Sequence, residues 1–188
     1  MRFFIFSLFF ILITISPYHL PLLSAQIRPP VVAGKFYPAD PAELKKAVDS
    51  YLKNAPEPPK FPGPVLCLLV PHAGYDFSAP IAAAGYKSLA TKYSTVVIIG
   101  AAHAIPVKGA AIYPSGEFLT PLGRVKVDTG LAKKLLKESP LFEDNRRAHA
   151  GEHSVEVQLP FLQRKLEEGF KILPIVMNTD DFETAIKI

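Results

Sequence analysis

Two histidines follow two apolar runs of the chain at similar distances. His72 comes one proline after residues 65–70, and His103 comes two alanines after residues 95–100. Such runs are typical of strands buried on both faces of a parallel sheet, and the carboxyl ends of parallel strands meet at one edge. Because imidazole nitrogen binds iron, copper and zinc alike, the pattern predicts a metal site that uses His72 and His103 as ligands.

A third candidate region reads His-Ala-Gly-Glu-His, from His149 to His153. The pattern H-x-x-E-H occurs in inverted zinc peptidases, where both histidines hold zinc and the glutamate, here Glu152, is the general base. That alternative requires one continuous helix, whereas Gly151 favours a helix start, with Glu152 complementing the helix dipole in the first turn. The favoured interpretation places His153 at the helix start as a catalytic group that donates or accepts a proton at the metal site.

Several other kinds of site are excluded by what the sequence lacks. Its single cysteine, Cys67, cannot form an internal disulfide, a thiolate zinc cage or a Cys-ligated iron–sulfur cluster, and its apolar neighbours predict that it is buried. The sequence contains no P-loop, no dinucleotide-binding glycine motif and no nucleophile elbow. A net charge of +4 without a basic run gives no reason to expect nucleic acid as a partner.

The elements that must position these residues alternate between strands and helices. Asp40 and the following proline predict a helix over 41–52, and residues 65–70 and 95–100 are predicted strands. Between these strands, residues 80–91 form a predicted helix capped by Ser78, which gives a right-handed parallel crossover. Further predicted strands cover 110–113, 117–119, 124–127 and 170–176. A helix is predicted over 129–139, another begins at Glu152 and is kinked at Pro160, and a third begins at Thr179. This order predicts an α/β domain over 26–188 with a mixed, largely parallel sheet flanked by helices.

Residues 1–25 have the organisation of a signal peptide. Arg2 precedes an apolar run over 3–15, which is shorter than the roughly 20 residues that span a membrane, and Ser24-Ala25 is a candidate cleavage site. Leu23 is large for the position three residues before that site, so an uncleaved N-terminal anchor is the alternative. The expected location is periplasmic or extracellular, or membrane-anchored, with no membrane span in the mature domain.

Five ordered motifs strongly resemble those of the Memo family, which includes the AmmeMemoRadiSam system protein B group. The motifs lie at 28–38, 71–75, 99–103, 120–123 and 152–161. The resemblance implies a fold similar to the class III extradiol dioxygenase catalytic subunit, with a non-haem iron site. It also implies that His72 and His103 match the metal-binding histidines, and that His153 matches a further histidine of the site.

The resemblance carries further expectations. Family members continue past the position of Ile188, and the remaining metal-site position lies in that part, so the domain is expected to be C-terminally truncated. Expected partners are a small-molecule or peptide ligand, a radical SAM protein and an AMMECR1-domain protein of the same system. Because that system is intracellular, a misplaced start codon and a cytoplasmic protein are the alternative to export.

The resulting functional hypothesis is a metal-site protein, with iron or copper as the expected metal and zinc as an alternative. Metal-dependent redox or dioxygenase-type chemistry is one consequence, although the carboxylate of a two-histidine, one-carboxylate triad is not identifiable in the sequence. The alternative from another class is a non-catalytic protein that keeps the fold and binds a peptide or small ligand, because a fold alone does not establish catalysis.

Overall fold

The strand Lys171–Met177 (β7) lies at the centre of a seven-stranded sheet in the computed structural model, which describes residues 26–60 and 62–177. One edge of β7 pairs in parallel with Thr95–Ala101 (β2) over the full length of both strands. Two strands share the other edge of β7. Gly123–Val127 (β5) pairs in parallel with the start of β7, and Ala110–Ile112 (β3) pairs antiparallel with the end of β7. Five consecutive residues of β7 are buried, as expected for a strand with partners on both edges.

The remaining strands extend this sheet outward from β5 and β3. Glu117–Thr120 (β4) pairs antiparallel with β5, and Ile27–Arg28 (β1) pairs parallel with β4. Phe142–Asp144 (β6) pairs parallel with β3. Four of the six strand pairings among the described residues are therefore parallel, which confirms the predicted α/β class with a mixed, largely parallel sheet.

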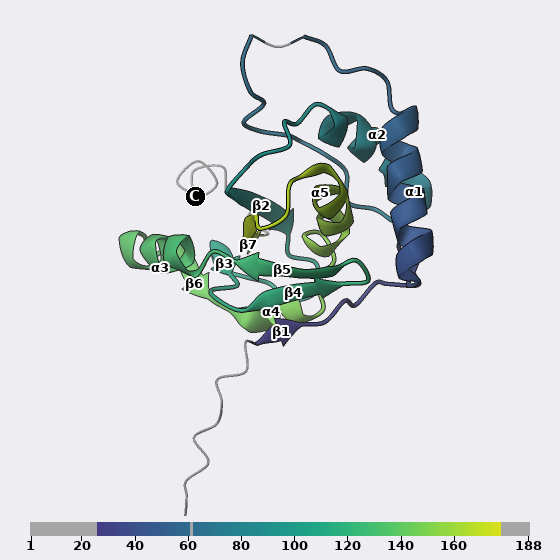
Figure 1. Ribbon diagram of the computed structural model, residues 1–188. Helices are drawn as coiled ribbons and strands as arrows, with labels where there is room; N and C mark the ends of the chain where they lie inside the picture. Colours follow the sequence, from purple (N-terminus) through teal and green to yellow (C-terminus); the bar gives the residue numbers. More distant parts are fainter. Residues whose placement is uncertain (1–25, 61, 178–188) are drawn as a thin grey trace, which may run out of the picture.

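Helices gather in two places around the sheet (Figure 1). Pro41–Asn54 (α1), Tyr75–Lys87 (α2) and Leu159–Lys165 (α5) contact one another on one side. Thr129–Glu138 (α3) lies against β6 and β7, and the short helix Arg146–Ala150 (α4) lies against β3. None of the described helices is long and apolar enough to cross a membrane.

Local signals explain why α1 forms where it was predicted. The carboxylate of Asp40 accepts hydrogen bonds from the backbone N–H groups of Ala42 and Glu43, both at 2.9 Å, and Pro41 occupies the first turn. Leu44 and Val48, one turn apart, are fully buried. The predicted strands at 95–100, 110–113, 117–119, 124–127 and 170–176 and the predicted helix at 129–139 are likewise confirmed, with shifts of one or two residues at their ends.

The predicted strand over 65–70 is wrong. These residues are irregular, and Leu66, Cys67 and Leu69 are exposed, so the predicted burial of Cys67 is wrong as well. The physical reason is that a strand needs a neighbour, and no described strand pairs with this segment. The parallel crossover predicted between 65–70 and β2 is therefore not formed in the described structure.

Two predicted helix starts are also corrected. Helix α2 begins at Tyr75 rather than at residue 80, because the Tyr75 N–H donates to the Phe36 carbonyl (2.7 Å) and its hydroxyl donates to the Val157 carbonyl (2.8 Å). No helix begins at Glu152. A turn at this point leads into the 3-10 helix Glu156–Gln158, which is followed by α5. Pro160 lies in the first turn of α5 and therefore does not kink the interior of a helix. The predicted helix start at Thr179 and the predicted signal peptide over 1–25 lie outside the described residues.

Candidate metal centre

Three histidines from separate parts of the chain lie together at the carboxyl end of β2. His72, His103 and His153 each offer one ligand nitrogen, and these atoms all lie within 4.8 Å of one another. The imidazole centroids are 4.7 Å apart for His103 and His153, which stack, and 5.2 Å apart for His72 and His103. His103 is the most exposed of the three, with 45% of its side chain accessible, so the cluster is open to solvent on its side.

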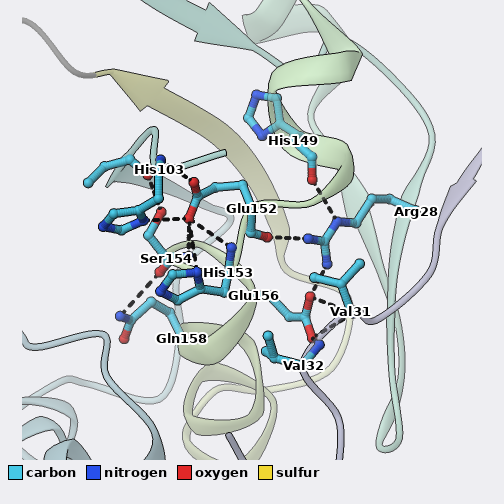
Figure 2. A network of polar contacts seen from close by, with 11 residues as sticks. Arg28, Val31, Val32, His103, His149, Glu152, His153, Ser154, Glu156 and Gln158 are labelled. Atoms are coloured by element: carbon cyan, nitrogen blue, oxygen red, sulfur yellow. Dashed lines mark hydrogen bonds and ion pairs between the residues drawn. The ribbon is translucent and has the colours of Figure 1, made fainter. Parts of the chain in front are cut away.

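Glu152 holds His103 in place and fixes which of its nitrogens is free (Figure 2). One carboxylate oxygen accepts from the His103 backbone N–H (2.6 Å), and the other lies 3.0 Å from His103 Nδ1. Because an ionised carboxylate can only accept, Nδ1 is the nitrogen that carries the proton, and Nε2 is the nitrogen that is left to face a metal. A carboxylate that holds a histidine in this way is a common outer partner of metal-binding imidazoles.

The same carboxylate shapes the turn that carries His153. One Glu152 oxygen also accepts the backbone N–H groups of His153 (2.7 Å) and Ser154 (2.8 Å). Burial alone would raise the pKa of Glu152, but the hydrogen bonds from the His103 side chain and from the backbone of Ser154, His103 and His153 lower it to about 2. Glu152 is therefore ionised at neutral pH, and both of its oxygens already have partners.

Close contact between the Glu152 turn and the end of β2 brings His153 beside His103. A Cβ atom on Gly100 would lie 2.3 Å from Ser154 Oγ, so a larger residue at this point of β2 would displace the Ser154 side chain. Ser154 Oγ in turn donates to the Ala101 carbonyl at 2.8 Å. On its other side, the His153 ring meets Phe36 edge to face at a centroid distance of 4.9 Å.

His72 is positioned through the residue that precedes it. The Gln158 side-chain amide donates to the Pro71 carbonyl (3.3 Å) and the Ser154 carbonyl (3.4 Å), and its oxygen accepts from the Tyr86 hydroxyl (2.8 Å). Burial lowers the pKa of His72, and the neighbouring His103 lowers it further. Burial likewise lowers the pKa of His153. Both imidazoles therefore favour the neutral form, which is the form that binds metal.

A buried ion pair anchors the whole turn to the N-terminal strand. The Arg28 guanidinium pairs with the Glu156 carboxylate and also donates to the backbone carbonyls of Glu152 and His149. Both charged side chains are almost fully buried, at 3% and 0% exposure. Arg28 thus connects β1 directly to the residue whose carboxylate holds His103 (Figure 2).

His149 does not join the cluster, and the inverted zinc peptidase interpretation is wrong. Helix α4 ends at Ala150 with Gly151 as its cap, so His149 and His153 do not share a helix. The His149 ring lies against Tyr113 and Phe118, and its Nε2 is 3.1 Å from the Ala111 carbonyl. Burial is the main reason that the pKa of His149 falls to about 4.

Comparison with known proteins identifies the family of this chain. The family model for Memo-like proteins matches residues 28–188. The chain belongs to the Memo-like family. It is 41% identical over 169 residues to a MEMO1 family protein of Methanopyrus kandleri, a match that covers 86% of this chain and 60% of that protein. A MEMO1 family protein of Ignicoccus hospitalis is 44% identical, over 80% of this chain and 56% of that protein. One of Sulfolobus acidocaldarius is 42% identical, over 85% of this chain and 61% of that protein.

This Memo-like chain therefore spans about 60% of the length of the curated relatives it matches. Its mixed sheet flanked by helices is consistent with the dioxygenase-like fold that the resemblance implied. All three site histidines named from the sequence lie in the cluster, whereas their individual roles remain predictions.

Sequence reasoning missed what Glu152 and Arg28 do. The sequence pattern predicts only a helix-dipole role for Glu152, because nothing in a local pattern shows that its carboxylate reaches residue 103. The available signal was its position: it directly precedes a candidate site histidine in a segment rich in polar residues. Arg28 gave no signal beyond its place in a family motif, because its partners are more than 120 residues away along the chain.

Replacing Glu152 with glutamine is expected to weaken zinc binding by about 10–100-fold. Glutamine keeps the size but loses the charge, and its amide nitrogen cannot accept a hydrogen bond. It therefore cannot accept from His103 Nδ1 and from the backbone N–H groups of His103, His153 and Ser154 together. Calorimetric titration of the chelator-treated chain with zinc measures the change. Glu143→Gln, in the edge strand β6 and outside the histidine cluster, is the matched control and should leave the affinity within about threefold. An unchanged affinity in Glu152→Gln would contradict the positioning role.

The buried His149 predicts a loss of stability in mild acid. Its pKa is about 4 in the folded chain, against 6.5 for an unperturbed histidine, so between these pH values the unfolded chain binds the extra proton. Stability should fall as pH drops from 6.5 to 4, by up to about 3 kcal/mol, and then level off for this group. Urea unfolding at several pH values, with chelator present, measures this loss. The free energy of unfolding should fall less steeply with pH in His149→Gln, which keeps a donor for the Ala111 carbonyl. A pH profile identical to that of the unchanged chain would refute the prediction. The lowered pKa of Glu152 affects stability at lower pH, between 4.5 and about 2, where stability falls as the pH drops.

Proposed function

We propose that this Memo-like protein binds a divalent or redox-active metal at His72, His103 and His153. The observation that carries the proposal is the convergence of three imidazole nitrogens to within 4.8 Å. Two of these imidazoles are biased towards the neutral form, and the third has its Nδ1 held by an ionised carboxylate. Metal–nitrogen bonds near 2 Å need only a small inward movement of such rings, so the donor set fits a metal.

Iron or copper is the proposed metal, with zinc as the alternative, because imidazole suits all three. When bound, iron or copper would supply one-electron and oxygen chemistry, and zinc would supply Lewis acidity. The residues of this chain would orient the ligand rings, keep one imidazole face open to solvent and hold a proton on His103 Nδ1. Competition titrations with the three metals, read by calorimetry, rank their affinities.

Metal-dependent redox or dioxygenase-type chemistry is the activity that we propose for the loaded site. In that role His153 would transfer a proton to or from the bound substrate, which requires one of its nitrogens to stay free of metal. Oxygen uptake by the iron-loaded protein with catechol-type compounds tests the activity. Turnover that is lost in His153→Ala while metal binding persists would assign proton transfer to His153; joint loss of binding and turnover would assign it as a ligand.

One observation favours the alternative of a non-catalytic binding protein. The carboxylate nearest the cluster, Glu152, has both oxygens engaged by His103, His153 and Ser154, so the described residues offer three imidazoles and no free carboxylate for a two-histidine, one-carboxylate triad. Metal and ligand binding without oxygen uptake would support this alternative.

The family resemblance also supports proposals about partners and location. A radical SAM protein and an AMMECR1-domain protein are the proposed protein partners, and co-purification of the tagged chain from its own host tests them. Cell fractionation tests export against a cytoplasmic location, and the mass of the mature chain shows whether the N-terminal segment is removed.

A further inference from the structure

His72 reaches the cluster from an irregular part of the chain. It lies in the loop before α2, which begins only at Tyr75. Within the described residues, the backbone of His72 itself forms no hydrogen bond. His103 differs in this respect, because Glu152 binds both its backbone N–H and its ring. The position of the His72 ring therefore depends on contacts that its neighbours in the chain make.

Buried side chains hold the residues on both sides of His72. The Pro71 carbonyl accepts from the Gln158 side-chain amide at 3.3 Å. The Ala73 carbonyl accepts from the Ser78 hydroxyl at 2.7 Å. Gln158 and Ser78 are both buried, so water has little access to these two contacts. His72 is thus flanked by two anchored carbonyl groups, one on each side along the chain.

Helix α2 fixes the orientation of the Gln158 amide. A carbonyl can only accept, so the amide NH₂ group must face Pro71, and the amide oxygen is left to accept from the Tyr86 hydroxyl at 2.8 Å. Tyr75, three turns earlier on the same helix, donates its hydroxyl to the Val157 carbonyl at 2.8 Å. Two tyrosines of α2 therefore bind two consecutive residues of the segment that follows the metal-site turn.

Gln158 also contacts the turn that carries His153. Its amide nitrogen lies 3.4 Å from the Ser154 carbonyl, directly after His153, and an amide NH₂ group has one proton for each of its two carbonyl partners (Figure 2). The rings of His72 and His153 are 6.0 Å apart between centroids. A change at residue 158 therefore alters where the His72 loop lies relative to the His153 turn.

We propose that Gln158 and Ser78 are positioning residues of the metal centre, which hold the loop so that the His72 ring reaches an ion bound by His103 and His153. This inference rests on the proposed metal site. Neither side chain belongs to the set of three ligand nitrogens. They act by ordering the loop before the ion arrives, because a ligand ring that is already in place loses less freedom on binding.

Replacing Gln158 with methionine tests the proposal. Methionine has a similar length and cannot donate to the Pro71 carbonyl, so zinc affinity in the chelator-treated chain should fall by about tenfold. Ser78→Ala removes the contact on the other side of the loop and should lower the affinity by about threefold or more. Calorimetry gives both values. Unchanged affinity in either variant would overturn the role of the residue that it replaces.

Gln163→Met is the matched control. The Gln163 amide has the same bonding pattern as Gln158 but lies outside the cluster: its oxygen accepts from the Thr120 hydroxyl at 2.7 Å, and its nitrogen donates to the Gly123 carbonyl at 3.3 Å. This variant should keep zinc affinity within about twofold. An equal loss in both glutamine variants would mean a general loosening of the fold and would overturn the proposal.

A second substitution separates positioning of His72 from a wider structural effect. In a chain that already carries His72→Ala, Gln158→Met should change zinc affinity by less than about twofold, because the ring that Gln158 positions is absent. A full tenfold loss in that background would show that Gln158 acts on the other two ligands, and would overturn the proposal.

Nuclear Overhauser contacts between imidazole rings test the geometry without metal. The rings of His72 and His103 lie 5.2 Å apart between centroids, and those of His103 and His153 lie 4.7 Å apart. In the chelator-treated Gln158→Met chain, the first contact should be lost and the second kept. A persisting first contact, or its absence from the unchanged chain, would overturn the proposal. If the unchanged chain binds no zinc, the proposed function fails, and the ring contacts still decide whether Gln158 positions His72.

Discussion

Replacing Glu156 with glutamine is expected to lower the free energy of unfolding by about 3–5 kcal/mol. The carboxylate is fully buried and accepts from the Arg28 guanidinium, the Tyr37 hydroxyl (2.6 Å) and the backbone N–H groups of Val31 and Val32. Glutamine keeps the shape but leaves the buried Arg28 charge without its counter-charge, and its NH₂ group faces donors. Urea denaturation measures the loss.

A surface pair provides the matched control for this substitution. Arg124 and Glu117 approach to 3.3 Å, but the arginine is 57% exposed, so Glu117→Gln should cost about 1 kcal/mol or less. The double variant Arg28→Met with Glu156→Met removes both buried charges and should be less destabilised than the sum of its two single variants. A loss below about 1 kcal/mol in Glu156→Gln, or strict additivity in the double variant, would show that the pair does not anchor the turn.

Replacing His103 with alanine is expected to weaken zinc binding by at least about 100-fold. His103 is the histidine whose ring lies within about 5 Å of both others, and its Nδ1 is already directed towards Glu152. His72→Ala should have a similar effect, because it removes a donor from the other side of the cluster. Calorimetry on the chelator-treated variants gives the affinities.

His149→Gln is the control for the histidine variants. This histidine is buried against Tyr113 and outside the cluster, so its replacement should leave zinc affinity within about threefold. The inverted zinc peptidase pattern predicts the opposite ranking, with His149 essential and His72 dispensable. Unchanged affinity in both His72→Ala and His103→Ala would contradict the proposed centre.

The histidines of the cluster could be predicted because their signals are local. A buried strand has a recognisable composition, and a side chain just past its end lies at the edge of the sheet. For His103 the predicted strand forms and leads to the cluster, but its predicted burial on both faces is wrong, because Val97 and Ile99 are about half exposed. For His72 the residue was right although the predicted strand before it is wrong: Gln158, rather than strand pairing, holds Pro71.

The remaining features depend on contacts between distant parts of the chain. Nothing near Glu152 shows that its carboxylate will accept four hydrogen bonds and so form a turn where helical spacing predicts a helix. Likewise, residues 65–70 have strand composition, but pairing depends on a neighbour that the described residues do not provide. Composition gives a preference, and tertiary partners decide whether it is realised.

The central claim is that one metal ion binds among His72, His103 and His153. Its most direct test is an anomalous difference map at the zinc absorption edge from crystals of the chain grown with zinc, because zinc imposes no geometric preference of its own. The proposed site predicts one strong peak about 2.0–2.1 Å from a nitrogen of His103 and within bonding distance of His72 and His153. A map with no peak among these three rings, or with its strongest peak at His149, would contradict the account.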